Sequence, residues 1–337
     1  MTDDHGGRVR TTDEALADRF EEHRPHLRAV AYRMLGSLAE AEDAVQETWL
    51  RLGRSDTADV RNLGGWLTTV TGRICLDLLR SRTARREQPI GEDSTFVPDP
   101  VVRPLSAVDP EQEALRSDAV ALALLVVLET LEPAERLAFV LHDLFAVPFE
   151  DIAGIVERSP AAARQLASRA RRRVQGATPS AERDLARQRA VVDAFLAASR
   201  AGDFEALVAV LDPDVVLRAD AGAKVRGLAA SKLVRGARQV AGQSLLFRHF
   251  APYARVALVG DAVGVVNVVD GRLVSVMAVT VVDGRVVALD ILADEERVAA
   301  LDVPDLASLE PAHPAAPDAP AAPDAPGGPG DLDGRGA

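Results

Sequence analysis

The spacing of the apolar residues changes near residue 182, and this change constrains the fold more than any other feature of the sequence. Before it, apolar side chains recur every three or four residues, which is the period of amphipathic helices. After it come further helical segments and then β-branched runs such as 264–269, separated by Asp270-Gly271 and Asp283-Gly284, which are strong hairpin signals. A chain of 337 residues is long enough for two or three domains. The sequence therefore predicts a multidomain protein, with all-α domains followed by an α+β domain.

Composition places the boundaries between these domains. Residues 87–112 contain six prolines or glycines and many acids, which predicts a flexible linker. From about residue 301 the chain is rich in Ala, Pro and Asp and has too little apolar surface to form a core, which predicts disorder. The expected organisation is a helical domain over 1–86, a flexible linker over 87–112, a second helical domain over 113–178, an α+β domain over 182–300 and a disordered tail over 301–337.

Several classes of site and location are disfavoured. The only cysteine, Cys75, lies among apolar residues and is expected to be a small buried side chain. The six histidines do not cluster at ligand spacing, and no phosphate-binding glycine loop is present, so we expect no metal and no cofactor. No apolar run approaches the roughly 18 residues of a membrane span, and no secretory signal follows Met1, so we expect a cytoplasmic protein without membrane contact.

Residues 149–174 have the pattern of a helix-turn-helix. Ser159 and Pro160 are a favoured N-cap and first helical residue, following a turn after Val156. The second helix has small apolar residues on one face and no acidic residue from Ser159 to Val174. Although the net charge of −12 argues against non-specific coating of nucleic acid, this local excess of arginine favours DNA binding over a solvated face. The candidate DNA-binding residues here are Arg164, Gln165, Ser168, Arg169 and Arg172.

Two earlier segments also have a polar face that a partner could use. Ser37 and Glu40 have the spacing of a capping box, which predicts the start of a helix. On that helix an acidic face with one apolar residue could dock on a basic partner, although a solvated face is the commoner case. Its residues are Asp43, Gln46, Glu47 and Leu50.

A following helix combines aromatic, threonine and arginine side chains, which suit stacking on unpaired bases, although Trp66 could equally be a core residue. Its candidate residues are Trp66, Arg73, Arg80 and Arg82.

Together these segments resemble the extracytoplasmic-function sigma factors of RNA polymerase. The segment 42–49 is similar to the part of sigma domain two that grips the polymerase clamp, and 65–82 is similar to the part that melts and reads the minus-ten element. The segments 131–136 and 159–169 are similar to sigma domain four, which reads the minus-thirty-five element. The resemblance covers roughly residues 15–176. It implies two partners, core RNA polymerase and promoter DNA, and a role in promoter-specific transcription initiation.

The α+β domain resembles the cone-shaped SnoaL-like domain that a sigma-J-like subgroup of these sigma factors carries at its C-terminus. In that subgroup the extension is taken to regulate the sigma domains in cis. The subgroup often has an Asp-Gly-Gly-Gly-Lys loop, where this chain reads Asp220-Ala221-Gly222-Ala223-Lys224. It also often has a Gly-Pro-Trp-Leu-Pro-Glu-Pro-like linker, where this chain has only 96–100. The resemblance marks Asp220, Gly222 and Lys224 as candidate regulatory residues.

Two other functions stay open from the residues alone. One is a helix-turn-helix regulator with a ligand-binding C-terminal domain, which would have no use for the clamp-like segment. The other is a SnoaL-type enzyme with a DNA-binding appendage. Its candidate acid–base residues, Asp220, Arg248, His249 and Asp290, are scattered and no motif joins them. We therefore expect no enzyme and no catalytic residue, while a small ligand in the C-terminal domain stays an open prediction.

Overall fold

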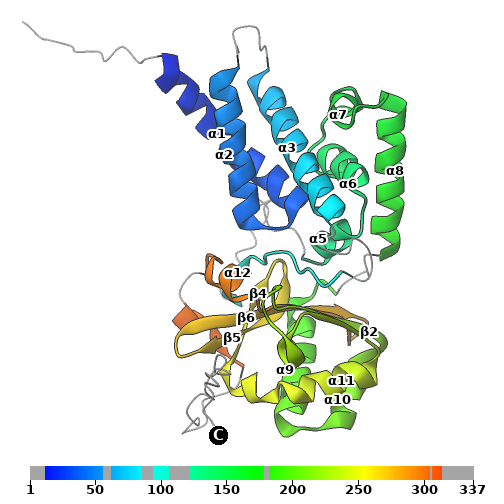
Figure 1. Ribbon diagram of the computed structural model, residues 1–337. Coiled ribbons are helices and arrows are strands. Elements are labelled where there is room, and N and C mark those ends of the chain that lie inside the picture. Colours follow the sequence, from blue (N-terminus) through cyan, green and yellow to red (C-terminus); the bar gives the residue numbers. More distant parts are fainter. Residues whose placement is uncertain are drawn as a thin grey trace, which may run out of the picture.

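The structure, a computed structural model, describes residues 12–55, 62–85, 94–105, 122–177, 182–303 and 306–312. Three N-terminal helices, each in contact with the other two, form the first domain (Figure 1). They are α1 (Thr12–Leu35), α2 (Leu38–Arg54) and α3 (Leu63–Arg85). Leu27, Val45 and Leu67, one from each helix, are fully buried, as the apolar periodicity predicts.

The second helical domain contains the expected helix-turn-helix. Its elements are α5 (Leu122–Glu129), α6 (Pro133–Phe139), the π-helical turn η2 (Val140–Leu144), α7 (Phe149–Val156) and α8 (Pro160–Ala177). Glu157 ends α7 in the left-handed conformation, with a φ of 56°, and the hydroxyl of Ser159 accepts a hydrogen bond from Ala162 N at 3.2 Å. The predicted turn and N-cap are therefore confirmed.

The C-terminal domain combines helices with one mixed sheet. Its helices are α9 (Leu185–Ala201), α10 (Phe204–Val210), η3 (Gly227–Ala229), α11 (Ala237–Leu246), η4 (Arg248–Tyr253), α12 (Glu295–Ala299) and η5 (Leu306–Ser308). Its strands are β2 (Leu211–Asp220), β3 (Lys232–Arg235), β4 (Ala254–Val259), β5 (Ala262–Val269), β6 (Arg272–Val282), β7 (Arg285–Leu292) and β8 (Glu310–Pro311). The expected hairpins join β5 to β6 and β6 to β7, and both residues of each Asp-Gly turn have positive φ.

The sheet is buried on both faces. Its order is β1-β4-β5-β6-β7-β2-β3, where β1 is the short strand Val102–Arg103, and β8 also pairs with β4. Along β5, Val263 and Val265 belong to the core under the helices α9 to α11, whereas Val266 and Val268 belong to a core shared with the helical domains. Because neighbouring side chains of a strand point to opposite faces, the sheet separates these two cores. Figure 1 shows α9, α10 and α11 on one side of the sheet and the helical domains on the other.

The prediction of a flexible linker is wrong for residues 94–105. Val97 and Val102 are buried in the shared core, and the short strand β1 (Val102–Arg103) pairs antiparallel with β4. The linker therefore covers part of an edge of the sheet, which would otherwise be open to pairing with another chain. The remaining linker residues, 87–93 and 106–112, lie outside the described residues.

The prediction of a disordered tail from residue 301 is wrong for 306–312. Leu309 is 1% exposed, and Glu310 accepts hydrogen bonds from Arg189 of α9 at 2.9 and 3.2 Å. Strand β8 pairs with β4 beside β1. The Ala, Pro and Asp repeats that motivated the prediction, at 313–337, lie outside the described residues. Over the described ranges, no helix combines the length and the apolar character that a membrane span requires.

Candidate functional site

The helix α8 presents a polar face to solvent. Its opposite face is buried through Ala163, Ala167 and Ala170, whose small side chains let α8 approach α6 and α7 closely. The five candidate DNA-binding residues of this helix are all exposed: Arg164, Gln165, Ser168, Arg169 and Arg172. The sequence therefore placed the apolar and polar faces of this helix correctly.

The exposed arginines of α8 differ in what holds them. The guanidinium of Arg164 lies 5.1 Å from the ring centroid of Phe149 in α7, a cation–π contact that orients it. The guanidinium of Arg169 forms an ion pair with Glu135 of α6 at 2.8 Å. Arg169 therefore has an intramolecular partner that competes with a phosphate or a base, whereas Arg164 has only a ring beneath it among the contacts described.

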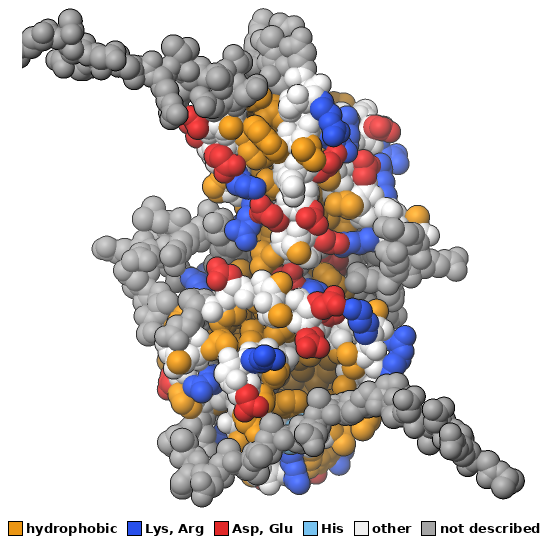
Figure 2. Space-filling view, turned by 60° about the vertical axis from the view of Figure 1, so that its left-hand side comes forward, with side chains coloured by type: hydrophobic (Ala, Val, Ile, Leu, Met, Phe, Trp, Pro, Cys, Tyr) orange, Lys and Arg blue, Asp and Glu red, His pale blue; other side chains and the backbone are white. Residues whose placement is uncertain are grey.

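The predicted docking face of α2 is also at the surface. Asp43 and Gln46 are exposed, Glu47 is half-buried and pairs with Arg51 at 3.0 Å, and Leu50 is 43% exposed. Figure 2 brings the side of the molecule that carries α1 and α2 forward, and acidic side chains lie beside hydrophobic ones on its N-terminal part. An exposed leucine among acids is the combination predicted for docking on a basic partner with an apolar contact.

A hollow of about 340 Å³ lies between α2 and α3. Among the described residues, it is lined by an aromatic side chain, a small polar one and three arginines: Trp66, Thr69, Arg51, Arg54 and Arg73, with Ser55 and Val70. Trp66 is half-buried against the core residues of the first domain, so it is both a packing residue and a wall of this hollow. Sequence reasoning missed Arg51 and Arg54, because their position beside Trp66 depends on how α2 packs on α3.

The other two arginine candidates of α3 have different surroundings. Arg80 is exposed. The side chain of Arg82 is only 17% exposed, forms an ion pair with Glu40 and donates a hydrogen bond to the carbonyl of Leu35 at 3.4 Å. The structure therefore assigns Arg82 a role in holding α3 against α2, which differs from the expected contact with DNA.

The two helical domains pack directly against each other. Arg73 of α3 donates a hydrogen bond to the carbonyl of Gly154 in α7 at 3.1 Å. Arg136 of α6, which is 1% exposed, donates to the carbonyl of Arg33 in α1 at 3.2 and 3.3 Å and pairs with Glu129 at 2.6 Å. Because an unpaired buried guanidinium is costly, these contacts hold the domains in one arrangement.

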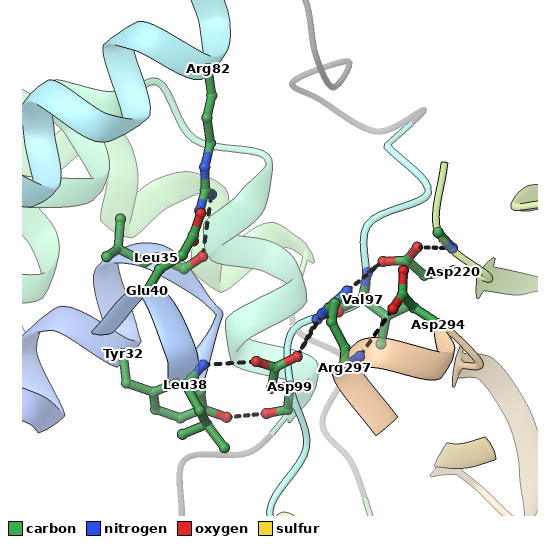
Figure 3. Close-up of polar contacts among 11 residues, drawn as sticks. Tyr32, Leu35, Leu38, Glu40, Arg82, Val97, Asp99, Asp220, Asp294 and Arg297 are labelled. Carbon is green, nitrogen blue, oxygen red and sulfur yellow. Dashed lines mark hydrogen bonds and ion pairs between the residues drawn. The ribbon is translucent and has the colours of Figure 1, made fainter. Parts of the chain in front are cut away.

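Arg297 of α12 links the C-terminal domain to the linker. Its guanidinium pairs with Asp99 at 2.5 Å and with Asp220 at 2.7 Å, and it donates to the carbonyl of Val97 at 2.6 Å. It also lies 4.6 Å from the ring centroid of Phe96. Asp220 in turn accepts a hydrogen bond from Val97 N at 3.2 Å. Figure 3 shows Arg297 between the two carboxylates. We call Asp99, Asp220 and Arg297 the linker clamp.

Asp99 extends the clamp to the first domain, where it takes the place of the capping box predicted for α2. Ser37 is the N-cap of α2, but its side chain makes no capping hydrogen bond, and Glu40 pairs with Arg82. The carboxylate of Asp99 instead accepts from Leu38 N at 2.7 Å. The predicted capping box is therefore wrong, because a linker residue satisfies this end of the helix. The backbone of Asp99 also contacts the first domain, because its amide donates to the carbonyl of Gly36 and its carbonyl accepts from the Tyr32 hydroxyl at 2.5 Å.

The backbone hydrogen bond between these two segments runs from Asp99 N, the donor, to the carbonyl of Gly36, the acceptor, at 2.7 Å. Asp99 thus contacts the first domain through its amide, its carbonyl and its carboxylate, and the C-terminal domain through Arg297. Burial of the Tyr32 hydroxyl against Asp99 raises the pKa of that phenol above its usual range. One linker residue therefore joins the first domain to the C-terminal domain.

The three candidate regulatory residues all contact α12, the helix that carries Arg297. Asp220 pairs with Arg297, and Lys224 pairs with Glu296 at 2.5 Å. Gly222 has a φ of 76°, and a Cβ placed on it would lie 2.0 Å from the carboxylate of Asp294, which caps α12 by accepting from Arg297 N. A side chain at position 222 would therefore displace the Asp294 side chain that caps α12.

A cavity of about 330 Å³ lies between the sheet and the helices of the C-terminal domain. Its walls are mainly apolar, with a few polar side chains. The four acid–base candidates are not brought together in it. Asp290 is buried on the other face of the sheet, where it pairs with Arg218 at 2.5 Å, and Asp220 belongs to the clamp, while Arg248 and His249 are exposed. Over the described residues, no group of His, Cys, Asp and Glu has the geometry of a metal site.

Comparison with known proteins assigns the helical domains. Residues 19–85 match Sigma-70 region 2, and residues 121–174 match Sigma-70, region 4. The chain is 37% identical over 273 residues to the probable ECF RNA polymerase sigma factor SigI of Mycobacterium tuberculosis, which covers 80% of this chain and 90% of that protein. The chain belongs to the ECF RNA polymerase sigma factors. As a sigma factor, it is a transcription initiation factor that binds core RNA polymerase and promoter DNA.

A further relative extends the likeness to the C-terminal domain. The chain is 47% identical over 225 residues to the ECF RNA polymerase sigma factor SigJ of Mycobacterium tuberculosis, and the match covers 66% of this chain and 69% of that protein. The crystal structure of SigJ aligns with a TM-score of 0.63 at 38% identity and covers 85% of this chain and 100% of that one. The expected family and fold class, two helical sigma domains and a SnoaL-like α+β domain, are confirmed. The stand-alone helix-turn-helix regulator is not favoured.

Proposed function

We propose that the exposed polar face of α8 reads the minus-thirty-five element of the promoter. The observation that carries this proposal is the division of α8 into a buried face of small residues and an exposed face of arginine, glutamine and serine. Such side chains can donate and accept hydrogen bonds at base edges in the major groove, and flanking arginines can hold phosphates. Run-off transcription with core polymerase, on promoters altered at each position of this element, tests the assignment.

Arg164→Ala should weaken binding to the minus-thirty-five element more than Arg169→Ala does. Loss of a base contact costs about 1–3 kcal/mol and relaxes specificity at one position. Arg169 is already paired with Glu135, so its contribution to DNA binding should be smaller. The measurement is footprinting of holoenzyme on promoter variants. Arg187→Ala, an exposed arginine of the C-terminal domain, is the control and should leave occupancy unchanged. Equal occupancy for Arg164→Ala and the unaltered chain would count against α8 as the reader.

The hollow beside Trp66 suits an unpaired base of the minus-ten element. Trp66 offers a stacking surface, and Arg51, Arg54 and Arg73 surround it with positive charge for the flanking phosphates. We include Arg51 and Arg54 in the proposed DNA-binding set on this basis. The exposed face of α2, with Asp43, Gln46, Glu47 and Leu50, is the proposed contact with core polymerase.

The compact arrangement has to open before both promoter elements can be read. The names of the elements place them about 25 base pairs apart, which is roughly 85 Å at 3.4 Å per base pair. In the structure, α3 and α7 are in hydrogen-bond contact through Arg73 and Gly154, and α7 packs against α8. The helices proposed to read the two elements are therefore too close together to occupy both at once. We propose that this arrangement is the form of the protein that is not bound to a promoter.

Energy transfer between dyes on the two sigma domains should fall when core polymerase and promoter DNA are added. Ala39→Cys on α2 and Gln175→Cys on α8 place the dyes at exposed positions. The natural Cys75 is buried, and burial raises the pKa of its thiol to about 12, so it should react poorly with a maleimide dye. Addition of duplex DNA without a promoter and without polymerase is the control. Unchanged energy transfer in the promoter complex would contradict the opening.

We further propose that the C-terminal domain regulates this opening through the linker clamp. The clamp holds residues 94–105 against the sheet, and Asp99 holds the same segment against α1 and α2. Because the chain between the sigma domains is bound in this way, it is not free to extend. Release of the linker would permit the sigma domains to separate, since the linker is the covalent connection between them.

A further inference from the structure

The cavity of the C-terminal domain has the composition of a binding site for a small apolar molecule. Its volume of about 330 Å³ is within the range of ligand pockets. Three phenylalanines and a methionine contribute large apolar surfaces to its lining: Phe195, Phe247, Phe250 and Met277. Close-packed protein interiors contain few voids of this size. A cavity left open among such side chains therefore suggests an apolar occupant.

Lys232 gives this cavity its one cationic group among the lining residues described. It lies on the edge strand β3, it is half-buried, and burial lowers the pKa of its ammonium group. Its ammonium group donates to two neutral acceptors, the carbonyl of Leu228 and the side chain of Gln243, and it lies 5.2 Å from the ring centroid of Phe247. No ion pair with a carboxylate is found for Lys232 in the described part of the chain. An ammonium group has three donors, so a bound anion could take the third and supply the missing counter-charge.

We propose that this cavity binds an apolar carboxylate, with the hydrocarbon part among the phenylalanines and the carboxylate on Lys232. The class of ligand follows from two features of the lining, its mainly apolar surface and the single half-buried cation at one side. Asn267 and Ser275, which share a hydrogen bond of 2.9 Å, are further polar groups of the wall. The site assigns no chemical reaction to the ligand, because the acid–base candidates lie outside the cavity.

The position of the cavity also connects it to the clamp. On β2, Leu217 and Ala219 line the cavity, whereas the residues that alternate with them, Arg218 and Asp220, bind the linker at Ser94 and Val97. The same alternation holds on β7, where Leu289 and Ile291 line the cavity and Asp290 pairs with Arg218. A ligand would therefore contact β2 and β7 on one face of the sheet, while β2 binds the linker on the opposite face, where its Arg218 is paired with Asp290 of β7.

We infer that occupation of the cavity changes the stability of the linker clamp. This step rests on the proposed regulatory function of the C-terminal domain. A ligand can shift the clamp only if it binds its closed and open forms with different affinity, and by linkage the clamp then changes the affinity for the ligand. Contact with β2 and β7 provides a physical route for such a difference.

Calorimetric titration of the full chain with decanoate and with 1-naphthoate tests the site. We expect at least one of them to bind, and decanol, which lacks the charge, to bind more weakly than decanoate. Lys232→Met should weaken carboxylate binding by about tenfold or more, the change expected when a charge-assisted hydrogen bond is lost, and should leave decanol binding unchanged. Arg187→Met is the control, since the side chain of Arg187 is 75% exposed and pairs with Glu182 outside the cavity.

Two cavity-filling variants, Ala251→Trp and Ala229→Trp, should each abolish binding of the carboxylates and of decanol. Circular dichroism identifies a variant that has failed to fold. In that case the result is taken from the other variant. The site is overturned if neither carboxylate binds the unaltered chain at millimolar concentration, or if Lys232→Met and the folded filling variants bind as the unaltered chain does.

Hydrogen exchange of residues 94–103, with and without the carboxylate that binds, tests the connection to the clamp separately. We expect the exchange rates of these amides to change at least severalfold on binding. Binding without any change would overturn the connection and leave the site in place. The proposed regulation through the clamp would also stand in that case, because it is tested by substitution of Arg297 in the absence of ligand.

Discussion

Reversal of charge at both Asp43 and Glu47, by substitution with lysine, should abolish binding of this sigma factor to core RNA polymerase. Asp43 is exposed and Glu47 half-buried, four residues apart on α2, and neither belongs to the buried face of the helix. If this face meets a basic surface, two lysines place like charges against each other, and such juxtaposition costs several kcal/mol. Loss of 4 kcal/mol would weaken binding about a thousandfold. The measurement is co-purification with core polymerase, followed by titration.

The charge change itself needs a control. Glu205→Lys with Asp214→Lys gives the same change in net charge at two exposed positions of the C-terminal domain, and should bind core polymerase as the unaltered chain does. The double variant on α2 should remain folded, because among the described residues the only ion pair it removes is the surface pair of Glu47 with Arg51, which contributes little. Wild-type affinity in the α2 double variant would show that this face is not the docking surface.

Substitution of Arg297 by alanine should release the linker from the C-terminal domain. The side chains of Asp99 and Asp220 are 6% and 11% exposed, and without Arg297 both would be buried carboxylates that have lost their ion pair. Removal of one partner from a buried ion pair costs about 3–5 kcal/mol. We expect faster hydrogen exchange at residues 94–103, earlier cleavage of this segment by proteases, and a several-fold change in transcription output.

Lys224→Ala distinguishes release of the linker from a general weakening of α12. Lys224 forms an ion pair with the same helix, but both partners are largely exposed, so the pair should contribute little. Hydrogen exchange at residues 94–103 should therefore stay close to that of the unaltered chain. If Arg297→Ala also leaves this exchange unchanged, the clamp does not hold the linker. If the exchange rises while transcription stays unchanged, the proposed regulation through the clamp is wrong.

The helix-turn-helix shows how much of a site can be read from local sequence. Ser159 and Pro160 start α8, and the small residues from Ala163 to Ala170 mark its buried face. Capping acts within one helical turn and the helical period repeats every 3.6 residues, so both signals lie within a short window. The Asp-Gly hairpins are local for the same reason, since two residues of positive φ determine the turn.

The surroundings of the arginines in the first domain depend on packing between helices. Arg51 and Arg54 reach the hollow beside Trp66 only because α2 lies against α3. Arg82 was grouped with the DNA-binding arginines because of its basic neighbours, but its guanidinium forms an ion pair with Glu40 of α2. A run of arginines in a sequence does not distinguish the exposed members from those with an intramolecular partner.

The sequence by itself determined the three domains, the helix-turn-helix, the hairpins and, through its motifs, the sigma factor family. The tertiary structure alone decided the course of the linker, which composition predicted to be flexible. Asp99 and Arg297 are 198 residues apart in the chain, and the same aspartate caps α2 in place of the predicted capping box. Proline and acidic residues favour extended, solvated chain when no partner is present. Here a half-buried arginine pairs with Asp99 and a sheet edge pairs with the backbone, and neither partner can be seen in the linker's own residues.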